Sequence, residues 1–334
     1  MKKWLIITVA AVLLVLYGAF AVFWYTGPGA GLQTTEPTAE TEQTAAPTQT
    51  TAATLPEQTQ PEETVPLETV MPPTYALTAR HAFVYDCGSE ELLYTLGDQE
   101  ESIAPASLTK LLTAYVALMY LDTDTLITAG EETTWIDPAS SVAHVKPGDT
   151  LSVELLVEGM LLQSGNDAAY ATAAAAGRVL AEDPGYPAKQ AVALFMEQVN
   201  VQAQALGLTG THFVTPDGLD AYDHYTTAED MLSIALLAME QPLLCHYSSL
   251  SKASVMYDNG ETYTYRSTNF LLQPDSQYYC PDACGMKTGT TKKAGSCLMA
   301  LFHNGEGYLL IGVFGCPKYE DRFADALQLY AMYG

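Results

Sequence analysis

Basic residues are scarce in this chain of 334 residues. It holds 14 lysines and arginines against 39 aspartates and glutamates, and its formal net charge at neutral pH is −25. Nucleic acids and anionic lipid surfaces attract proteins through clustered positive charge. The composition therefore predicts no nucleic-acid partner. It also makes any lysine that falls inside a patterned motif informative.

Sequence patterns typical of metal centres are missing as well. The six histidines are scattered, and neither a C-x-x-C nor an H-E-x-x-H arrangement occurs. Such spacings are what bring soft or imidazole ligands onto one metal ion. We therefore expect no metal and no cofactor, and we look for a catalytic apparatus made of serine, lysine and amide side chains.

The first 25 residues contain a long run without charge behind two lysines. Lys2 and Lys3 precede the 22 residues from Trp4 to Tyr25. As a helix this run would span about 33 Å, which is enough to cross a bilayer, and the lysines would hold the N-terminus inside. We expect residues 1–25 to be an uncleaved membrane anchor. The alternative is a signal sequence cleaved near Ala19-Phe-Ala21, which would release a secreted protein.

Residues 26–74 lack lysine and arginine and have almost no large apolar side chains. They are Thr, Pro, Gln, Glu and Ala in low-complexity order, with seven glutamates. Such a segment cannot bury enough surface to offset the entropy lost on ordering. We expect a disordered linker, about 35–40 Å from end to end. It would tether a folded domain of residues 75–334 on the outer side of the cell membrane.

Six cysteines in an exported chain raise the question of disulfides. Cys280 and Cys284 are close in sequence, and Cys297 and Cys316 fall in the two arms of an expected hairpin. The register of that hairpin places Cys297 opposite residues 312–314, so Cys316 overshoots it. We expect free, buried thiols.

Three short motifs follow one another in the folded part: Ser107-Leu-Thr-Lys110, Ser164-Gly-Asn166 and Lys287-Thr-Gly289. A serine nucleophile with a lysine one helical turn away, joined by a second Ser/Lys pair, suffices for acyl transfer without histidine. Each motif is short enough to recur by chance. Ser249-Leu-Ser-Lys252 and Ser267-Thr-Asn269 repeat the first two patterns in the same order.

Sequence context separates the two sets of motifs. Ser107 opens an apolar helical pattern that contains no glycine or proline, so Ser107 and Lys110 share one face of a helix. Ser249 stands among turn and strand residues, with Asn259-Gly260 as a hairpin signal. We therefore assign the first set to the active site.

From about residue 80 to the end, the chain resembles the D-alanyl-D-alanine carboxypeptidases, the low-molecular-mass penicillin-binding proteins. Thr215 departs from the family pattern, which usually has Asn immediately before the proline at position 216. The resemblance implies peptidoglycan stem peptides as substrates and β-lactam antibiotics as covalent inhibitors. The longer matching stretches are Pro105-Ala-Ser-Leu-Thr-Lys110, Lys146-Pro-Gly-Asp149, Ser164-Gly-Asn-Asp-Ala-Ala169, Thr211-His-Phe213 with Pro216-Asp-Gly-Leu219, and Lys287-Thr-Gly-Thr290 with Ala294-Gly295.

The predicted elements give an α+β fold. Strands at 82–85 and 92–96 precede helices at 107 onward, 151–162, 168–180, 194–206 and 228–239. Strands return at 253–266, 284–290, 295–303 and 307–315, and a helix over 320–332 ends the chain. The resemblance implies a serine β-lactamase-like arrangement. In it, an antiparallel sheet is flanked by helices, an all-helical lobe is inserted, and the active site lies between the lobes.

The resemblance also implies a role for each motif residue. Ser107 attacks the carbonyl of the penultimate D-Ala, a neutral Lys110 takes its proton, and Ser164 relays a proton to the leaving amine. A desolvated cleft and the Lys287 cation would keep Lys110 neutral. The remaining expected substrate-binding residues are Asn166, Lys287, Thr288, Gly289, Thr290 and Arg322. Arg322 is either a second contact for the substrate carboxylate or a surface charge of the last helix.

The expected function is a serine-type D-Ala-D-Ala carboxypeptidase that acts through an acyl-enzyme. A D,D-endopeptidase on cross-linked peptidoglycan would use the same residues and is the main alternative. A β-lactamase needs a glutamate for deacylation, and Glu197-Gln-Val-Asn200 has the wrong spacing. A non-catalytic wall-binding module would have no need of all three motifs.

Overall fold

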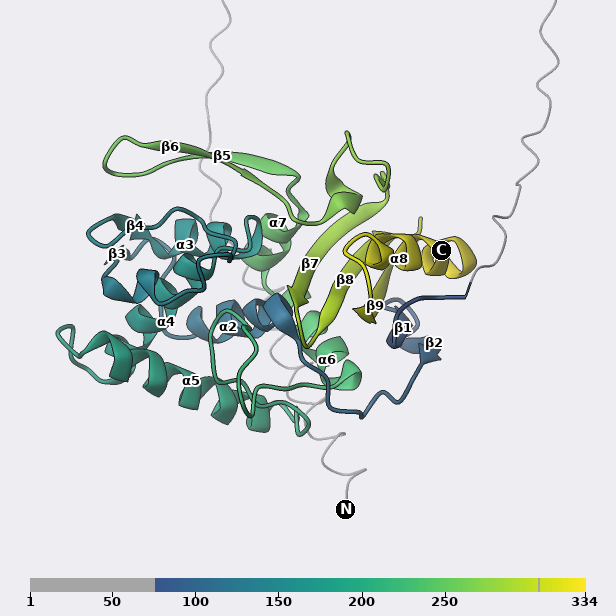
Figure 1. The fold of residues 1–334 in the computed structure, drawn as a ribbon, viewed down its shortest axis with the longest axis horizontal. Helices are drawn as coiled ribbons and strands as arrows, with labels where there is room; N and C mark the ends of the chain where they lie inside the picture. The colour runs from purple at the N-terminus through teal and green to yellow at the C-terminus, as the bar shows by residue number, and fades with distance from the viewer. Residues whose placement is uncertain (1–75, 306) are drawn as a thin grey trace, which may run out of the picture. The chain divides into compact units, whose positions relative to one another are not determined.

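The computed structural model describes residues 76–305 and 307–334. At its centre is a five-stranded antiparallel sheet in the order β2-β1-β9-β8-β7 (Figure 1). β1 pairs with β9, so the first hairpin of the domain joins the last three strands in one sheet. The strands are β1 (His81–Asp86), β2 (Glu91–Leu96), β7 (Ala283–Thr291), β8 (Gly295–His303) and β9 (Tyr308–Cys316).

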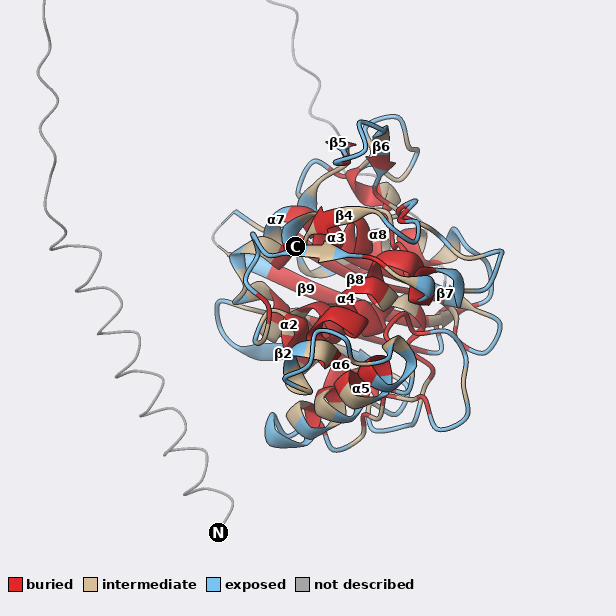
Figure 2. Ribbon diagram, turned by 90° about the vertical axis from the view of Figure 1, so that its left-hand side faces the viewer, coloured by how far each residue is buried: buried red, intermediate tan, exposed pale blue. Residues whose placement is uncertain are grey.

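The sheet is buried on both faces because its strands alternate apolar residues between two cores. Ala82, Leu298 and Ile311 pack with Phe323 beneath α8 (Asp321–Tyr333). On the opposite face, strand residues such as Met299 pack against the helices of the inserted lobe. Figure 2 shows the buried residues running along β8 and β9. The antiparallel sheet flanked by helices confirms the predicted α+β class.

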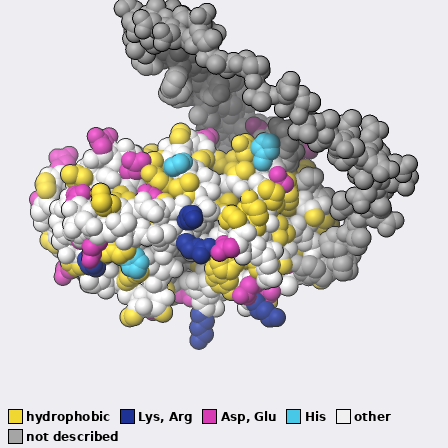
Figure 3. Space-filling view, turned by 90° about the horizontal axis from the view of Figure 1, so that it is seen from above, with side chains coloured by type: hydrophobic (Ala, Val, Ile, Leu, Met, Phe, Trp, Pro, Cys, Tyr) yellow, Lys and Arg dark blue, Asp and Glu magenta, His cyan; other side chains and the backbone are white. Residues whose placement is uncertain are grey.

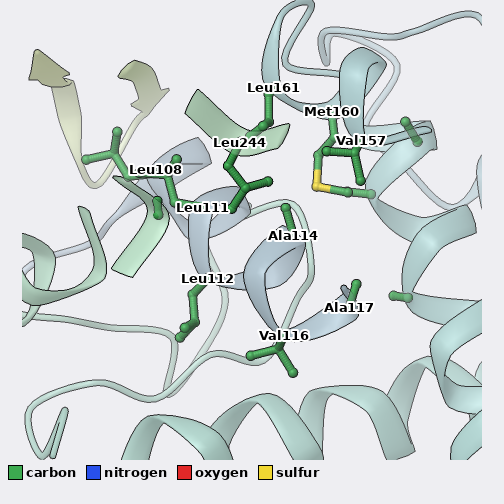
Figure 4. Close-up of a cluster of buried hydrophobic side chains, with 14 of the residues drawn as sticks. Leu108, Leu111, Leu112, Ala114, Val116, Ala117, Val157, Met160, Leu161 and Leu244 are labelled. Carbon is green, nitrogen blue, oxygen red and sulfur yellow. The ribbon is translucent and has the colours of Figure 1, made fainter. Parts of the chain in front are cut away.

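The inserted lobe is built around α2, of which eight residues are buried. Figure 4 shows Leu111 of α2 next to Leu244 of α7, with Met160 of α3 in the same apolar cluster. An alanine-rich α4 packs so closely on α5 that a Cβ at Gly177 would lie 1.9 Å from the Ala191 carbonyl oxygen. The helices are α2 (Thr109–Ala117), α3 (Val153–Leu161), α4 (Asn166–Leu180), α5 (Ala188–Ala205), α6 (Ala228–Met239) and α7 (Pro242–Ser249).

Several details differ from the sequence predictions. Ser107 lies in a 3₁₀ turn, Ala106–Leu108, that leads into α2. α5 begins six residues earlier than predicted, and α7 was not predicted at all, although a proline at its first position is a usual helix start. Two small two-stranded sheets, β3 (Leu126–Thr128) with β4 (Thr150–Ser152) and β5 (Lys252–Met256) with β6 (Thr262–Arg266), lie outside the main sheet.

All six cysteines are free, as expected, but only Cys280, Cys297 and Cys316 are buried, and the other three are half-buried. Ser296, not Cys297, pairs with Cys316 across β8 and β9, and the two thiols belong to the cores on opposite faces of the sheet. The predicted anchor (1–25) and linker (26–74) lie outside the described residues. Within residues 76–305 and 307–334, no helix has the length and apolar character needed to cross a membrane.

Candidate active site

The Ser107 hydroxyl and the Lys110 amine meet at the start of α2. Lys110 Nζ lies 2.9 Å from Ser107 Oγ, as the i, i+3 spacing predicts. The same amine donates to Asn166 Oδ1 at 2.7 Å and to the backbone carbonyl of Asp217 at 2.8 Å. The three acceptors come from the 3₁₀ turn before α2, from α4 and from the loop before α6, so they fix the amine at one point behind the wall of the cleft.

Burial makes the Lys110 amine lose its proton more readily than a surface lysine does. Its side chain is fully buried, and this desolvation lowers the pKa of Lys110 to about 8, against the opposing effect of Asp217 and Asp167. Burial disfavours the charged form of an amine because the ion loses its hydration. The lowered pKa raises the fraction of neutral amine near neutral pH, which a general base requires.

Ser164 and Lys287 form the second Ser/Lys pair. Lys287 Nζ donates to Ser164 Oγ at 2.8 Å and to the Thr288 carbonyl at 3.0 Å. Ser164 has a positive φ of 60° and lies just before α4. The pair joins β7 of the sheet to α4 of the helical lobe, so it spans the two lobes.

The expected electrostatic roles of the two lysines need a correction. The pKa of Lys287 is well below its ordinary value because of burial first, and then because of Lys110 and Arg322. The groups that act on Lys110 besides burial are two carboxylates, and both raise its pKa. Burial, rather than a Lys287 cation, therefore favours the neutral form of Lys110.

The motif residues line one cleft of about 500 Å³. Ser107, Ser164 and Asn166 belong to the helical wall, and Thr288, Gly289 and Thr290 of β7 form the sheet wall. Lys110 and Lys287 lie behind these walls, buried. Lysine and arginine side chains are few on the face of the molecule seen in Figure 3.

Two glycines bring backbone segments against the nucleophile turn. A Cβ at Gly289 would lie 3.0 Å from the Ser107 nitrogen, so β7 runs directly beside this turn. Gly218 has a φ of +85°, and a Cβ there would lie 1.9 Å from the Ala106 carbonyl oxygen. The close packing explains why these motifs contain glycine at these two positions.

Arg322 is not a surface charge, so that alternative is wrong. It is fully buried at the start of α8, where its Nη1 donates to the carbonyls of Gly289 (2.8 Å) and Cys297 (3.0 Å). Its guanidinium stacks 4.0 Å from the Tyr319 ring centroid. Its Nη2 has no hydrogen-bond partner in the described part of the chain, and the residue lines the cleft. A buried donor of this kind suits a carboxylate ligand.

One of the two motifs that the sequence context excluded, Ser267-Thr-Asn269, contributes a residue to the cleft that the sequence did not predict. Thr268, the middle residue of Ser267-Thr-Asn269, lines the cleft, and its hydroxyl lies 2.6 Å from that of Thr288. Asn269 caps a short 3₁₀ turn by accepting from Leu271 N at 3.1 Å. No local pattern marks Thr268, because it reaches the site only when the segment after β6 folds against β7.

The Ser249 motif is not a site. Ser249 ends α7 and donates to the His246 carbonyl at 2.8 Å, whereas Lys252 lies in β5 beyond the helix. The serine and lysine therefore do not share a helical face, as the sequence context predicts.

The Asp167 carboxylate holds a neighbouring backbone segment in place beside the cleft, a role that the sequence did not predict. Its carboxylate accepts from the backbone nitrogens of Ala143 (2.7 Å) and Val145 (2.8 Å). Asn166 N donates to the Ser141 carbonyl at 2.9 Å. These bonds hold the segment around Ser141 over the cleft that it lines.

Comparison with known proteins gives one family. Residues 67–317 match the family model described as D-alanyl-D-alanine carboxypeptidase. The D-alanyl-D-alanine carboxypeptidase DacC of Escherichia coli is 33% identical over 273 residues, covering 76% of this chain and 60% of that protein. DacB2 of Mycobacterium tuberculosis is 32% identical over 235 residues, covering 68% of this chain and 74% of that protein. The chain spans about 60% of the length of DacC and of DacF from Bacillus subtilis.

Solved structures agree with this match. The Streptomyces K15 DD-transpeptidase is 27% identical, with a TM-score of 0.69 over 77% of this chain and 97% of its own. Penicillin-binding protein D2 of Listeria monocytogenes, solved in an ampicillin-bound form, is 27% identical, with a TM-score of 0.62 over 78% of this chain and 98% of its own. Both similarities cover the domain that carries the cleft.

Proposed function

This chain belongs to the D-alanyl-D-alanine carboxypeptidase family, and we propose on that premise that it removes the terminal D-alanine from peptidoglycan stem pentapeptides. The reaction is a serine-type hydrolysis through an acyl-enzyme. The observation that carries the proposal is the Lys110 amine, which is buried and lies 2.9 Å from Ser107 Oγ. A binding module gains nothing from a lysine buried against a serine hydroxyl, because burying the amine costs hydration energy.

Acylation begins when neutral Lys110 takes the Ser107 proton and the serine oxygen attacks the penultimate D-Ala carbonyl. The backbone N–H groups of Ser107 and Thr290 are the proposed oxyanion hole, where one donor is worth about 3–4 kcal/mol. Ser164, held by Lys287, gives its hydroxyl proton to the leaving D-Ala nitrogen and receives in its place the proton that Lys110 took from Ser107, so Lys110 is neutral again. Free D-Ala then departs, and water hydrolyses the Ser107 ester.

The free carboxylate of the substrate fits the far end of the cleft. The Thr288 hydroxyl and the Nη2 of Arg322 are its proposed donors, while Asn166 and the backbone of Gly289 and Thr290 hold the peptide. The unpaired Nη2 supports this assignment. A site that grips a free C-terminus favours a carboxypeptidase, and β-lactams would acylate the same serine as inhibitors.

The assay that tests the proposal compares D-Ala release from a pentapeptide with cleavage of a cross-linked muropeptide. The proposal expects D-Ala release and little cleavage of the cross-link. Preferential cleavage of the cross-link would replace it with the D,D-endopeptidase alternative. Rapid hydrolysis of a penicillin would instead indicate a β-lactamase.

Arg322→Lys should raise KM for the pentapeptide more than it lowers kcat, since lysine lacks the planar fork that matches a carboxylate.

For the whole chain we propose three parts: an anchor or signal sequence (1–25), a linker (26–74) and the catalytic domain (75–334). The uncharged run behind Lys2 and Lys3 supports a single-pass membrane protein with the catalytic domain outside. Cell fractionation with N-terminal sequencing tests this placement. A mature N-terminus near residue 22 in a secreted fraction would favour the cleaved signal sequence.

A further inference from the structure

The helical lobe holds a second cavity that no step of the proposed reaction uses. Its volume is about 800 Å³, against about 500 Å³ for the cleft, and the two share no lining residue. It lies among β3, the 3₁₀ turn Glu131–Thr134, the C-terminal part of α4 and the start of α5. In Figure 1, β3 and α4 lie at the end of the domain opposite to α8. A ligand bound there would contact residues outside the catalytic apparatus.

Much of the cavity wall is apolar, and part of that wall faces solvent. Leu126 on β3 and Val179 on α4 are exposed, although water disfavours contact with apolar side chains. A ligand with an aliphatic body would cover this surface. The apolar lining residues include Leu126, Ile127, Ala175, Val179, Pro184 and Pro187.

The charged residues of the cavity are mainly acidic. Arg178 is the one basic side chain among its lining residues. The carboxylates that line it are those of Glu131, Glu132, Glu182 and Asp183. Four negative charges against one positive charge attract a cation and repel an anion.

Glu132 is the one buried carboxylate of these four, and one of its oxygens is unused. Its side chain is fully buried, and Oε1 accepts from Gly130 N at 2.8 Å. Its Oε2 has no hydrogen-bond partner within the described residues. Arg178 Nη2 lies 3.9 Å from Oε2, too far for a hydrogen bond, so this ion pair offsets only part of the cost of burying the charge. A cationic donor that reaches Oε2 would satisfy it.

The surroundings of the Glu132 carboxylate hold it in place. A Cβ at Gly130 would lie 2.6 Å from Oε2, so the Gly130 backbone closes one side. Thr133 Oγ1 donates to the Gly130 carbonyl at 3.1 Å, which holds the turn. Arg178 is fixed in turn, because its Nε donates to the Tyr186 carbonyl at 3.3 Å. A carboxylate positioned in this way loses little freedom when a ligand binds.

We propose that this cavity binds an aliphatic primary amine. The ammonium group donates to Glu132 Oε2, and the methylene chain lies against the apolar wall that includes Ile127 and Val179. A neutral alcohol of the same length would cover the wall but leave the carboxylate charge without a counter-charge. A carboxylate ligand would be repelled by the four acidic residues. The inference goes beyond the proposed function and does not depend on it.

Titration calorimetry of the full chain with pentylamine tests the ligand class. Pentylamine should bind, and 1-pentanol and pentanoate should bind at least about tenfold more weakly, since they lack the charge-assisted donor. Nα-acetyl-lysine methylamide carries the same ammonium group on a peptide. Tighter binding of this probe than of pentylamine would identify a lysine side chain of a peptide as the ligand, and weaker binding would identify a free amine.

Two substitutions test the site itself. Glu132→Gln keeps an acceptor for Gly130 N but removes the charge, so it should weaken pentylamine binding at least about tenfold. Val179→Lys places a competing cation in the cavity at an exposed helical position, and it should abolish binding. The matched controls are Glu197→Gln and Val201→Lys, which make the same changes at exposed positions of α5 outside the cavity. Both controls should bind pentylamine as wild type does.

The inference is overturned if wild type does not bind pentylamine, or if it binds 1-pentanol equally well. Unchanged binding in both Glu132→Gln and Val179→Lys would also overturn it. If Glu132→Gln does not fold, the comparison of Val179→Lys with Val201→Lys decides the question. Penicillin labelling of Ser107 should be the same in all these proteins. A wild-type chain that no penicillin labels would contradict the proposed function and not this site.

Discussion

The Nζ of Lys287 lies 2.8 Å from the Oγ of Ser164, at almost the same separation as Lys110 Nζ from Ser107 Oγ at 2.9 Å. Each lysine is buried, and each holds one serine at the wall of the same cleft. Ser107 and Lys110 come from one continuous segment, the 3₁₀ turn and the α2 helix that follows it, whereas Ser164 and Lys287 come from different lobes. The site therefore exists only when the sheet and the helical lobe are assembled.

Lys110→Arg should be nearly as inactive as Lys110→Ala. Arginine keeps the positive charge but cannot release its proton near neutral pH. The release of D-Ala should fall by at least about 100-fold in both variants. Substantial turnover by Lys110→Arg would show that charge alone matters and would remove the general-base role.

The rate of acylation should rise with pH through the pKa of Lys110. Burial lowers that pKa to about 8, so the neutral amine becomes the major form above this pH. We expect the kcat/KM for D-Ala release to increase toward a plateau above about pH 8. A plateau already reached at pH 6, or a rise only near pH 10, would contradict a buried, titrating Lys110.

His224 should make the folded domain sensitive to acid. Burial lowers its pKa from 6.5 to about 4, and its Nδ1 accepts from Val214 N at 3.0 Å. A proton on Nδ1 would remove this acceptor. Because the folded-state pKa is lowered, its contribution is fully present above pH 6.5 and is lost as pH falls toward 4. The loss is about 3 kcal/mol between pH 7 and pH 4.

Urea denaturation at several pH values checks this effect. His224→Gln should lessen the loss of stability between pH 7 and pH 4 by about 3 kcal/mol. His246→Gln is the control, since His246 is exposed on α7, and it should leave the pH dependence as in wild type. Equal pH dependence in all three proteins would refute the role of His224.

Gly218→Ala should destabilise the domain far more than Gly260→Ala. Both glycines have a positive φ, +85° and +83°, so backbone strain is similar, about 1 kcal/mol. A Cβ at Gly218 would meet the Ala106 carbonyl oxygen, whereas a Cβ at Gly260 meets nothing within 4 Å. We expect a loss of at least about 3 kcal/mol for Gly218→Ala. Equal losses in thermal denaturation would show that the contact is unimportant.

The sequence predicted the elements whose patterns are local. The apolar face after Ser107 predicted α2, and Asn259-Gly260 predicted the turn between β5 and β6, where Gly260 has positive φ. The i, i+3 spacing predicted the contact of Ser107 with Lys110. The family resemblance supplied the partners across the cleft, which no local pattern could place.

What the sequence could not supply depends on long-range packing. Thr268 reaches the cleft through its contact with Thr288, 20 residues away in sequence. Arg322 had two interpretations, and its burial excludes that of a surface charge. The unpaired oxygen of Glu132 is visible only once the surrounding donors have been placed. Burial and hydrogen-bond partners of this kind are properties of the assembled fold.

Covalent labelling by a fluorescent penicillin, followed by mass spectrometry of the labelled peptide, tests the central claim most directly. Wild type should carry the label on Ser107, and Ser107→Ala should lose both the label and D-Ala release. Ser249→Ala, which alters the same motif pattern outside the cleft, should retain both. Label that persists in Ser107→Ala, or that is lost in Ser249→Ala, would contradict the assignment of Ser107 as the nucleophile.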